Sequence, residues 1–320
     1  MKRRPDCVGA QDGYDTVEWA AKLSGSTGMV GSFGASYNGF VQWRLAALRP
    51  PSLVAMSAQT ISARYTDLEG PGTIRPGRRL KWWFSSMTPD LRRRHNRPGN
   101  YSKQEALRQW NADDEKKWLH FLPWLVLPRE AFEDETEAVQ HWLKNPHLDP
   151  WKLHEGCKDV SVPNFDVVGW YDHCNGDMQM FRSLVKDGKT KTAREKSQIV
   201  IGPWSHAGRG KSGYGNIRFG PSASFDLIDA QIRWFDFWLK GKKNGVDKDA
   251  PVRIFVMGDN TWRDEKRWPL ERTKDKVLYL TVRVRPVRGH VGENGTERLI
   301  RTDSTMGSTP LGVGRSCQSK

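Results

Sequence analysis

The sequence lacks the features of a membrane or secreted protein. It contains no run of about 18 apolar residues, the length at which a segment becomes a candidate transmembrane helix. Residues 1–4 begin as a signal peptide does, but Pro5, Asp6 and Cys7 follow where an apolar segment should start. We therefore expect no membrane partner and, by default, a cytoplasmic protein, while the oligomeric state stays open.

Cysteine is also scarce, and its spacing excludes the common cysteine-based sites. The four cysteines are far apart, without a C-x-x-C pair: Cys7, Cys157, Cys174 and Cys317. Neither a zinc ribbon nor a dense disulfide framework fits that distribution. His173, Cys174 and His206 show no recognised ligand spacing, so we expect no metal and no cofactor, and a metal hydrolase is the weakest functional alternative.

Positive charge, by contrast, is abundant. The chain has 51 Lys and Arg against 37 Asp and Glu, a formal charge of +14. Two stretches are densest in basic residues. The first is Arg75, Arg78, Arg79 and Lys81, followed directly by Trp82 and Trp83, and the second is Arg92, Arg93, Arg94 and Arg97. Such runs suit nucleic acid, but a solvated helix face with tryptophans turned inward is commoner. We therefore expect no nucleic-acid partner.

The apolar pattern near the N-terminus predicts a βαβ unit. A capping Asp15, helical spacing and the stop at Pro50-Pro51 delimit the elements. We expect a helix over 15–23, a strand over 29–33, a helix over 37–48 and a buried strand over 53–57. This order is typical of an α/β fold with a mostly parallel sheet, and 15 Trp with 12 Phe indicate a folded core.

The rest of the chain predicts a helical insertion followed by a return to strands. Helical spacing marks 103–118, 137–143, 176–186 and 225–239, and strand-like runs occupy 164–169, 198–201, 252–257 and 276–282. We expect four parts: α/β core over 1–62, helical cap over 63–151, core again over 152–245, and the start of a C-terminal β-domain with an irregular tail over 246–320.

Ser36 is the candidate nucleophile. A serine hydroxyl needs a base, a carboxylate that orients the base, and donors for the oxyanion. Ser36 stands between the strand 29–33 and the helix 37–48, in a sharp turn where small neighbours such as Gly34 and Gly39 are required. As a bare motif this turn is weak, because the second glycine of G-x-S-x-G is displaced by one position.

Asp172 and His206 supply the remaining two members of a triad. Each follows a strand-like run, in Gly-Trp-Tyr-Asp and Gly-Pro-Trp-Ser-His respectively. The order Ser, Asp, His is that of α/β-hydrolases. An Asp in a loop or a lone His is usually structural, but three such residues in this order predict a catalytic triad.

On these motifs the chain resembles the cocaine-esterase and X-Pro dipeptidyl-peptidase (CocE/NonD-type) family of serine hydrolases, over about residues 11–280. The resemblance implies that Ser36 attacks an ester or amide carbonyl, His206 transfers the proton and Asp172 orients His206. It also implies that the Tyr37 backbone N–H is one oxyanion donor. The family's second donor is a tyrosine hydroxyl from an upstream loop, and only 35 residues precede Ser36 here.

The family also continues into a C-terminal jelly-roll domain, whereas the last forty or so residues here do not alternate as strands do. We therefore expect a fragment, or a gene model with shifted frames, whose sheet lacks N-terminal strands and whose β-domain is truncated. The alternative function that follows is a catalytically impaired remnant of such a hydrolase; a basic nucleic-acid-binding protein is the third reading.

The sequence restricts the class of substrate but does not identify the substrate. In this family, the enzymes that select a free α-amino group are similar in having carboxylates two and three residues after the catalytic Asp. Cys174 and Asn175 occupy those positions here, so the resemblance does not imply a strict preference for an α-amino group. Asp67 and Glu69 are a weaker anionic candidate. Four tryptophans are candidates for an apolar acyl pocket or for the core of the cap: Trp82, Trp83, Trp118 and Trp124. Ester and short-peptide substrates both stay open.

Overall fold

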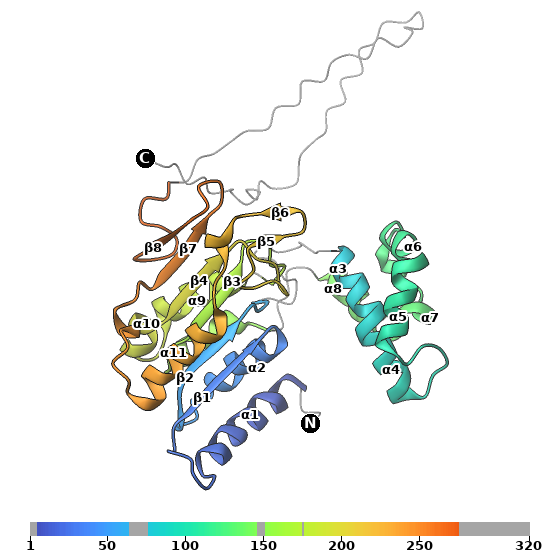
Figure 1. The fold of residues 1–320 in the computed structure, drawn as a ribbon. Helices are drawn as coiled ribbons and strands as arrows, with labels where there is room; N and C mark the ends of the chain where they lie inside the picture. Colours follow the sequence, from blue (N-terminus) through green and yellow to red (C-terminus); the bar gives the residue numbers. More distant parts are fainter. Residues whose placement is uncertain (1–4, 64–75, 146–150, 175, 275–320) are drawn as a thin grey trace, which may run out of the picture. The chain divides into compact units, whose positions relative to one another are not determined.

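The computed structural model describes residues 5–63, 76–145, 151–174 and 176–274 (Figure 1). Met1–Trp268 form one compact unit, separate from Pro269–Lys320. In the first part of the chain the elements are α1 (Pro5–Ala21), β1 (Val30–Ala35), α2 (Tyr37–Ala46) and β2 (Leu53–Gln59). After the helical segment come η4 (Leu153–Asp159), β3 (Phe165–Gly169), α9 (Asp177–Asp187), α10 (Lys191–Lys196), β4 (Gln198–Gly202), β5 (Gly213–Tyr214), β6 (Ile217–Arg218), η5 (Pro221–Ala223), α11 (Leu227–Lys240), η6 (Val246–Lys248), β7 (Val252–Val256) and β8 (Thr261–Glu265).

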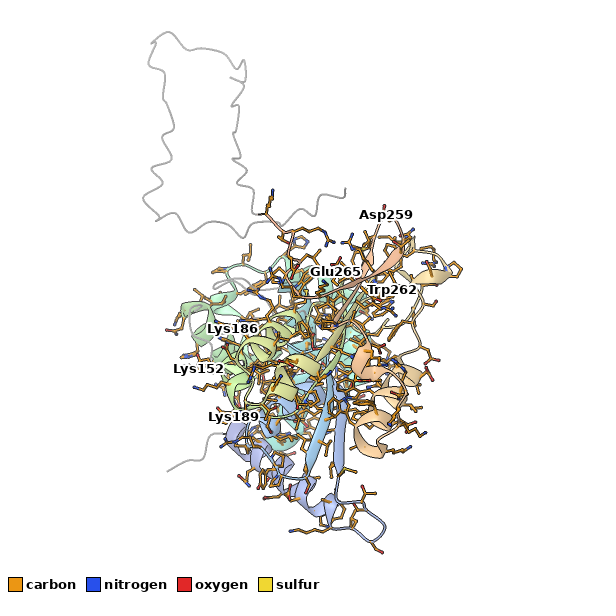
Figure 2. All side chains as sticks on the ribbon, turned by 90° about the vertical axis from the view of Figure 1, so that its left-hand side faces the viewer. Lys152, Lys186, Lys189, Asp259, Trp262 and Glu265 are labelled. Atoms are coloured by element: carbon orange, nitrogen blue, oxygen red, sulfur yellow. The ribbon has the colours of Figure 1, made fainter. Side chains whose placement is uncertain are left out.

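The principal strands run in one direction, apart from β8 at the end of the chain. β1 pairs parallel with β2, and β3, β4 and β7 pair parallel in that order. A parallel bridge between Met56 and Asn164 joins β2 to the start of β3. β8 returns antiparallel to β7, with Trp262 and Glu265 along it and Asp259 in the connecting turn (Figure 2). The carboxyl ends of β1 to β4 therefore lie at the same edge of the sheet.

Helices cover both faces of the sheet, and the side chains of β2 alternate between them. Met56 belongs to a buried cluster with residues of α2, η4, α9 and α10. Ala55 belongs to a second cluster, built around Trp234 of α11. Successive strand residues point to opposite faces, so a strand buried on both faces has to be apolar almost throughout. This arrangement confirms the predicted α/β architecture.

α11 shows how local sequence sets the limits of an element. Its N-cap residue Asp226 accepts a hydrogen bond from the backbone N–H of Asp229 at 2.9 Å. Gly241 ends the helix with φ of 63°, a left-handed conformation that favours glycine. Between these signals the apolar residues follow helical spacing and pack against the sheet.

Every described element between β2 and η4 is helical. The elements are α3 (Pro76–Trp82), η1 (Trp83–Met87), α4 (Thr88–His95), α5 (Lys103–Gln109), η2 (Trp110–Asp114), α6 (Glu115–Leu119), η3 (Trp124–Val126), α7 (Arg129–Phe132) and α8 (Glu135–Lys144). Their shared core contains Trp83, Trp110, Trp118 and Phe132. The segment has its own apolar cluster, which agrees with the predicted helical insertion, although its boundaries at residues 63 and 151 stay a prediction.

Several element boundaries differ from the sequence-based expectation. α1 begins at Pro5, ten residues before the predicted start at Asp15. The helix predicted over 103–118 is interrupted by the π-helical turn η2. β8 was not predicted, because its charged sequence Thr-Trp-Arg-Asp-Glu lacks a strand's apolar alternation. The strand predicted over 276–282, like the C-terminal tail, lies outside the described residues.

β7 and β8 extend the core sheet, since β7 hydrogen-bonds to β4. The compact unit extends to Trp268, and the expected start of the β-domain at residue 246 stays a prediction. The strand pattern alone could not show which sheet these residues join. None of the described helices is both long and apolar enough to cross a membrane.

Candidate active site

Ser36 occupies a strained turn between β1 and α2. Its backbone has φ of 59° and ψ of −126°, a conformation that costs a non-glycine residue free energy. The Ser36 N–H donates to the Gln59 carbonyl at 2.9 Å, and the Ser36 carbonyl accepts from the N–H groups of Gly39 and Phe40. The turn is thus fixed from both sides, as in the nucleophile elbow of α/β-hydrolases.

Glycine at position 39 lets α2 pass close to β2. A Cβ there would lie 2.8 Å from the Gln59 carbonyl oxygen and 2.7 Å from Ile61 Cγ2. Backbone at that distance has to move for any side chain to fit. The displaced glycine, which weakened the sequence motif, therefore has a steric role at its actual position.

Asp172 and His206 are brought together from the ends of β3 and β4. His206 Nδ1 lies 2.9 Å from Asp172 Oδ1 and 3.1 Å from Oδ2. The backbone N–H of Cys174 also donates to Asp172 Oδ1, at 2.7 Å. The Asp172 side chain is fully buried, whereas a quarter of the His206 side chain is exposed. A buried carboxylate thus orients an imidazole that solvent and substrate can reach.

Two close backbone approaches set the position of this pair. Tyr171 N–H donates to the Trp204 carbonyl at 3.0 Å, beyond the last paired residues of the two strands. A Cβ on Gly169 would lie 2.0 Å from the same carbonyl oxygen. Gly169 is therefore required for the two loops to run side by side after the strands end.

A buried group that the sequence analysis missed lies beneath the pair. Asp166 of β3 and Asp177 of α9 are fully buried and hydrogen-bonded to each other. Burial raises the pKa of both carboxyls, and their mutual repulsion raises that of Asp177 further. Asp177 also accepts from the Ile61 N–H at 3.0 Å, which ties the segment after β2 to α9. The raised pKa values favour a proton held between the two carboxyls.

Arg209 completes this electrostatic environment. Its guanidinium donates to Thr60 Oγ1 at 2.6 Å and interacts with the charges of Asp172, Asp166 and Asp177. Burial lowers the pKa of Arg209 and the three carboxyls act in the opposite direction. The position of Asp166 within the apolar run 164–169 could have indicated a buried carboxyl group. No comparable sequence pattern indicated the role of Arg209.

The other predicted site residues are placed as follows. Tyr37 is the first residue of α2, where a backbone N–H has no partner within its helix. Trp83 and Trp118 are buried in the core of the helical segment, Trp124 packs against it, and Trp82 is 38% exposed. Whether any of them contacts substrate stays a prediction. Asp67, Glu69 and Asn175 lie outside the described residues.

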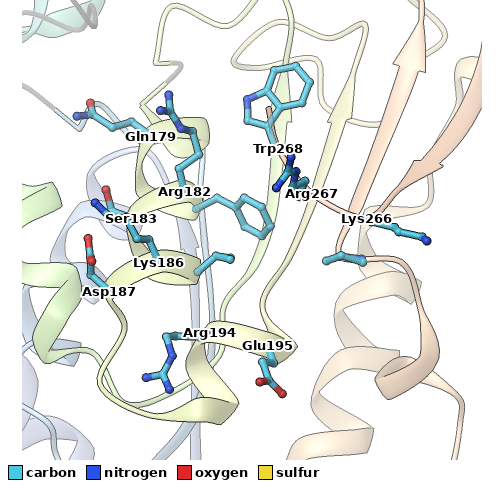
Figure 3. A pocket seen from close by; sticks show the side chains of 13 residues that line it. Gln179, Arg182, Ser183, Lys186, Asp187, Arg194, Glu195, Lys266, Arg267 and Trp268 are labelled. Atoms are coloured by element: carbon cyan, nitrogen blue, oxygen red, sulfur yellow. The ribbon is translucent and has the colours of Figure 1, made fainter. Parts of the chain in front are cut away.

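A cavity of about 670 Å³ lies between α9, α10 and residues 266–268. Figure 3 shows its lining, which includes Arg182, Lys186 and Trp268 but none of Ser36, Asp172 and His206. Size alone therefore does not identify the substrate site. The predicted catalytic residues lie instead at the carboxyl ends of β1, β3 and β4.

A parallel sheet between helical layers, a strained serine between strand and helix, and an Asp–His pair at the same sheet edge define the α/β-hydrolase class. The profile of the X-Pro dipeptidyl-peptidase (S15 family) matches residues 6–208. That of the X-Pro dipeptidyl-peptidase C-terminal non-catalytic domain matches residues 244–315. The chain therefore belongs to the X-Pro dipeptidyl-peptidase family, as the motifs predicted.

Individual relatives agree with this assignment. Cocaine esterase from Rhodococcus sp. (strain MB1 Bresler) is 26% identical over 288 residues, which are 84% of this chain and 47% of the esterase. An aminopeptidase structure from the marine sediment archaeon Thaumarchaeota archaeon aligns with a TM-score of 0.58 at 19% identity, covering 85% of this chain and 44% of the other.

A CocE/NonD family hydrolase from Staphylococcus aureus aligns with a TM-score of 0.54 at 20% identity, covering 85% of this chain and 40% of that one. These two structures support the α/β-hydrolase fold. The chain spans less than half the length of the relatives it matches.

Proposed function

We propose that this protein is a serine hydrolase that cleaves an ester or amide through an acyl-enzyme intermediate. The observation that carries the proposal is the strained backbone of Ser36 at the end of β1, on the sheet edge where Asp172 also orients His206. Backbone strain clusters at active sites. Because Glu133 has a similar conformation, with φ of 53° and ψ of −140°, the strain supports the proposal only together with the Asp172–His206 pair at the same sheet edge.

In the proposed reaction Ser36 Oγ attacks the substrate carbonyl carbon while His206 removes the hydroxyl proton. His206 then returns that proton to the leaving alkoxide or amine, and water hydrolyses the acyl-enzyme by the same route. Asp172 stabilises the imidazolium form of His206. The Tyr37 N–H, at the start of α2, stabilises the oxyanion together with the positive end of the helix dipole.

The substrate we propose has a bulky apolar acyl group and no obligatory free α-amino group. The position two residues after Asp172 is the buried Cys174, which offers no carboxylate for an ammonium group. The aromatic residues of the helical segment, Trp82 and Trp124 among them, are the proposed source of the apolar pocket. A panel of p-nitrophenyl esters and X-Pro substrates distinguishes esterase from peptidase activity.

A fluorophosphonate probe tests the proposal, because it forms a covalent bond only with an activated serine. We expect the wild type to be labelled and Ser36→Ala not to be. The exposed Ser26, changed to Ala, is the matched control and should leave labelling unchanged. Folded wild-type protein that takes up no label would count against the proposed activity and favour the second candidate, a catalytically impaired hydrolase.

A further inference from the structure

Four side chains that could ligate a metal converge at the ends of β3 and β4. Asp172, His173, Cys174 and His206 each offer one ligand atom, and these atoms all lie within 4.8 Å of one another. His173 Nδ1 is 3.8 Å from Asp172 Oδ1, and the two imidazole rings lie with their centroids 4.4 Å apart. The spacing of these residues in the sequence did not indicate a metal site, because His206 comes from a separate loop.

The donor set suits a thiophilic transition metal. One sulfur, two imidazole nitrogens and one carboxylate oxygen are ligands that Zn²⁺ takes in tetrahedral geometry. With Zn–N near about 2.0 Å and Zn–S near about 2.3 Å, ligand atoms lie roughly 3.3 to 3.7 Å apart. The present separations thus require a contraction of about 1 Å, which rotation of the two imidazole rings can supply.

Access and charge also favour a cation. The side chains of His173 and His206 are 24% and 25% exposed, so an ion can reach them from solvent. Asp172 and Cys174 are buried behind them. The ionised Asp172 and the Cys174 thiolate that forms on binding supply two negative charges. These outweigh the single positive charge of Arg209 beside Asp172.

We propose that Asp172, His173, Cys174 and His206 form a binding site for Zn²⁺ or a similar thiophilic ion, and that its occupancy inhibits the hydrolase. Coordination through His206 Nδ1 leaves the ring proton on Nε2, the nitrogen that has to accept the proton of Ser36. The thiol proton of Cys174 is released to solvent as the Cys174 sulfur binds the metal. No redox step is involved.

Cobalt binding tests the site without any need for enzymatic activity. The protein should carry Cys7→Ser and Cys317→Ser, so that Cys157 and Cys174 are its only thiols. Titration with Co²⁺ should give a thiolate-to-cobalt charge-transfer band that saturates at one ion per chain and is displaced by Zn²⁺. Cys174→Ser should lose the band, and His173→Gln should weaken affinity by about tenfold or more.

Cys157→Ser is the matched control and should retain the band. Burial raises the pKa of Cys157 to about 12, so its thiol is not a ligand at neutral pH. Absence of the band, or an equal band in Cys174→Ser, would overturn the site.

The inhibitory part rests on the proposed function and is tested separately. Zn²⁺ should slow fluorophosphonate labelling of Ser36 by about tenfold or more, a chelator should restore it, and Cys174→Ser should be insensitive. An unchanged labelling rate in protein that shows the cobalt band would overturn inhibition. Failure of the metal-free protein to label would count against the hydrolase, while the cobalt spectrum still decides the metal site.

Discussion

Asp172 holds His206 with both carboxylate oxygens, at 2.9 and 3.1 Å from Nδ1, while the backbone N–H of Cys174 fixes Oδ1. The carboxylate therefore has one orientation, in which Oδ1 accepts from the Cys174 N–H and also lies nearest to His206 Nδ1. Solvent does not reach it, since the side chain is fully buried. This relationship determines which tautomer of His206 is stabilised, and a single atom exchange should disturb it.

Asp172→Asn should reduce the rate of fluorophosphonate labelling by about 10³- to 10⁴-fold. With the Cys174 N–H holding the amide oxygen at the Oδ1 position, the amide NH₂ takes the place of Oδ2, 3.1 Å from His206 Nδ1, and replaces an acceptor by a donor. This weakens the preference for the tautomer with its proton on Nδ1. Labelling kinetics measure the effect, with urea unfolding to confirm the fold. The exposed Asp259, changed to Asn, should label at the wild-type rate; equal rates in both variants would contradict the role of Asp172.

Gly39→Ala should destabilise the protein by about 1–3 kcal/mol and slow labelling of Ser36. Its Cβ would lie 2.8 Å from the Gln59 carbonyl oxygen, so either α2 or β2 has to shift. Urea unfolding gives the free energy. Gly9→Ala in α1 is the control, because a Cβ there meets no atom within 4 Å and helix propensity favours alanine. Equal stability of the two variants would argue against a tight elbow.

Asp177→Asn should flatten the pH dependence of stability. Burial raises the pKa of Asp177 well above its ordinary value and that of Asp166 to about 8. The folded state therefore retains a proton that the unfolded chain releases above about pH 4. The stability due to the pair is full below that pH and falls, by up to about 1.4 kcal/mol per pH unit for one proton, as the pH approaches 8.

Asparagine imitates the protonated carboxyl of Asp177 and removes this proton release. Unfolding free energies measured in urea between pH 5 and 8 should fall less steeply for Asp177→Asn than for the wild type. Asp247→Asn, at an exposed position, should keep the wild-type slope. A slope that is unchanged by Asp177→Asn would show that the carboxyl pair holds no shared proton.

Glu133→Gln should loosen the helical segment by roughly 1–2 kcal/mol at neutral pH, because Arg97 is partly exposed and also pairs with Asp134. The buried Glu133 carboxylate accepts from Arg92 Nε at 2.9 Å and Arg97 Nη1 at 2.8 Å. Burial acts to raise the pKa of Glu133, but the hydrogen bonds from Arg97 and Arg92 outweigh it and hold that pKa below its ordinary value. The variant leaves the largely buried Arg92 without the Glu133 carboxylate and leaves Arg97 paired with Asp134 alone.

This stabilisation is present above the unfolded pKa of about 4.3 and is lost as the pH falls through the lower, folded pKa. Hydrogen exchange of residues 76–144 should be faster in Glu133→Gln at pH 7. Glu130→Gln, at an exposed side chain, should exchange as the wild type does. Equal exchange in the two variants would show that the basic run around Arg92 is only a solvated surface.

The sequence by itself determined the α/β order and the family. Alternating apolar runs predicted β1, α2, β2, β3, β4 and α11 to within a few residues, because buried strands and amphipathic helices need those patterns regardless of their neighbours. Short motifs around Ser36, Asp172 and His206 predicted the family. Each motif consists of neighbouring residues in one turn, so it can be recognised from the sequence without the tertiary structure.

Only the tertiary structure decided what depends on separate segments meeting. The charged strand β8 forms because β7 offers it a partner, and Arg97 pairs with Glu133 from the turn between α7 and α8. The pKa values of Asp166 and Asp177 are raised because β3 and α9 together exclude water from both carboxyls. The sequence spacing of Cys174 did not indicate a metal ligand. Cys174 lies close to His206 because the carboxyl ends of parallel strands meet at one edge of the sheet.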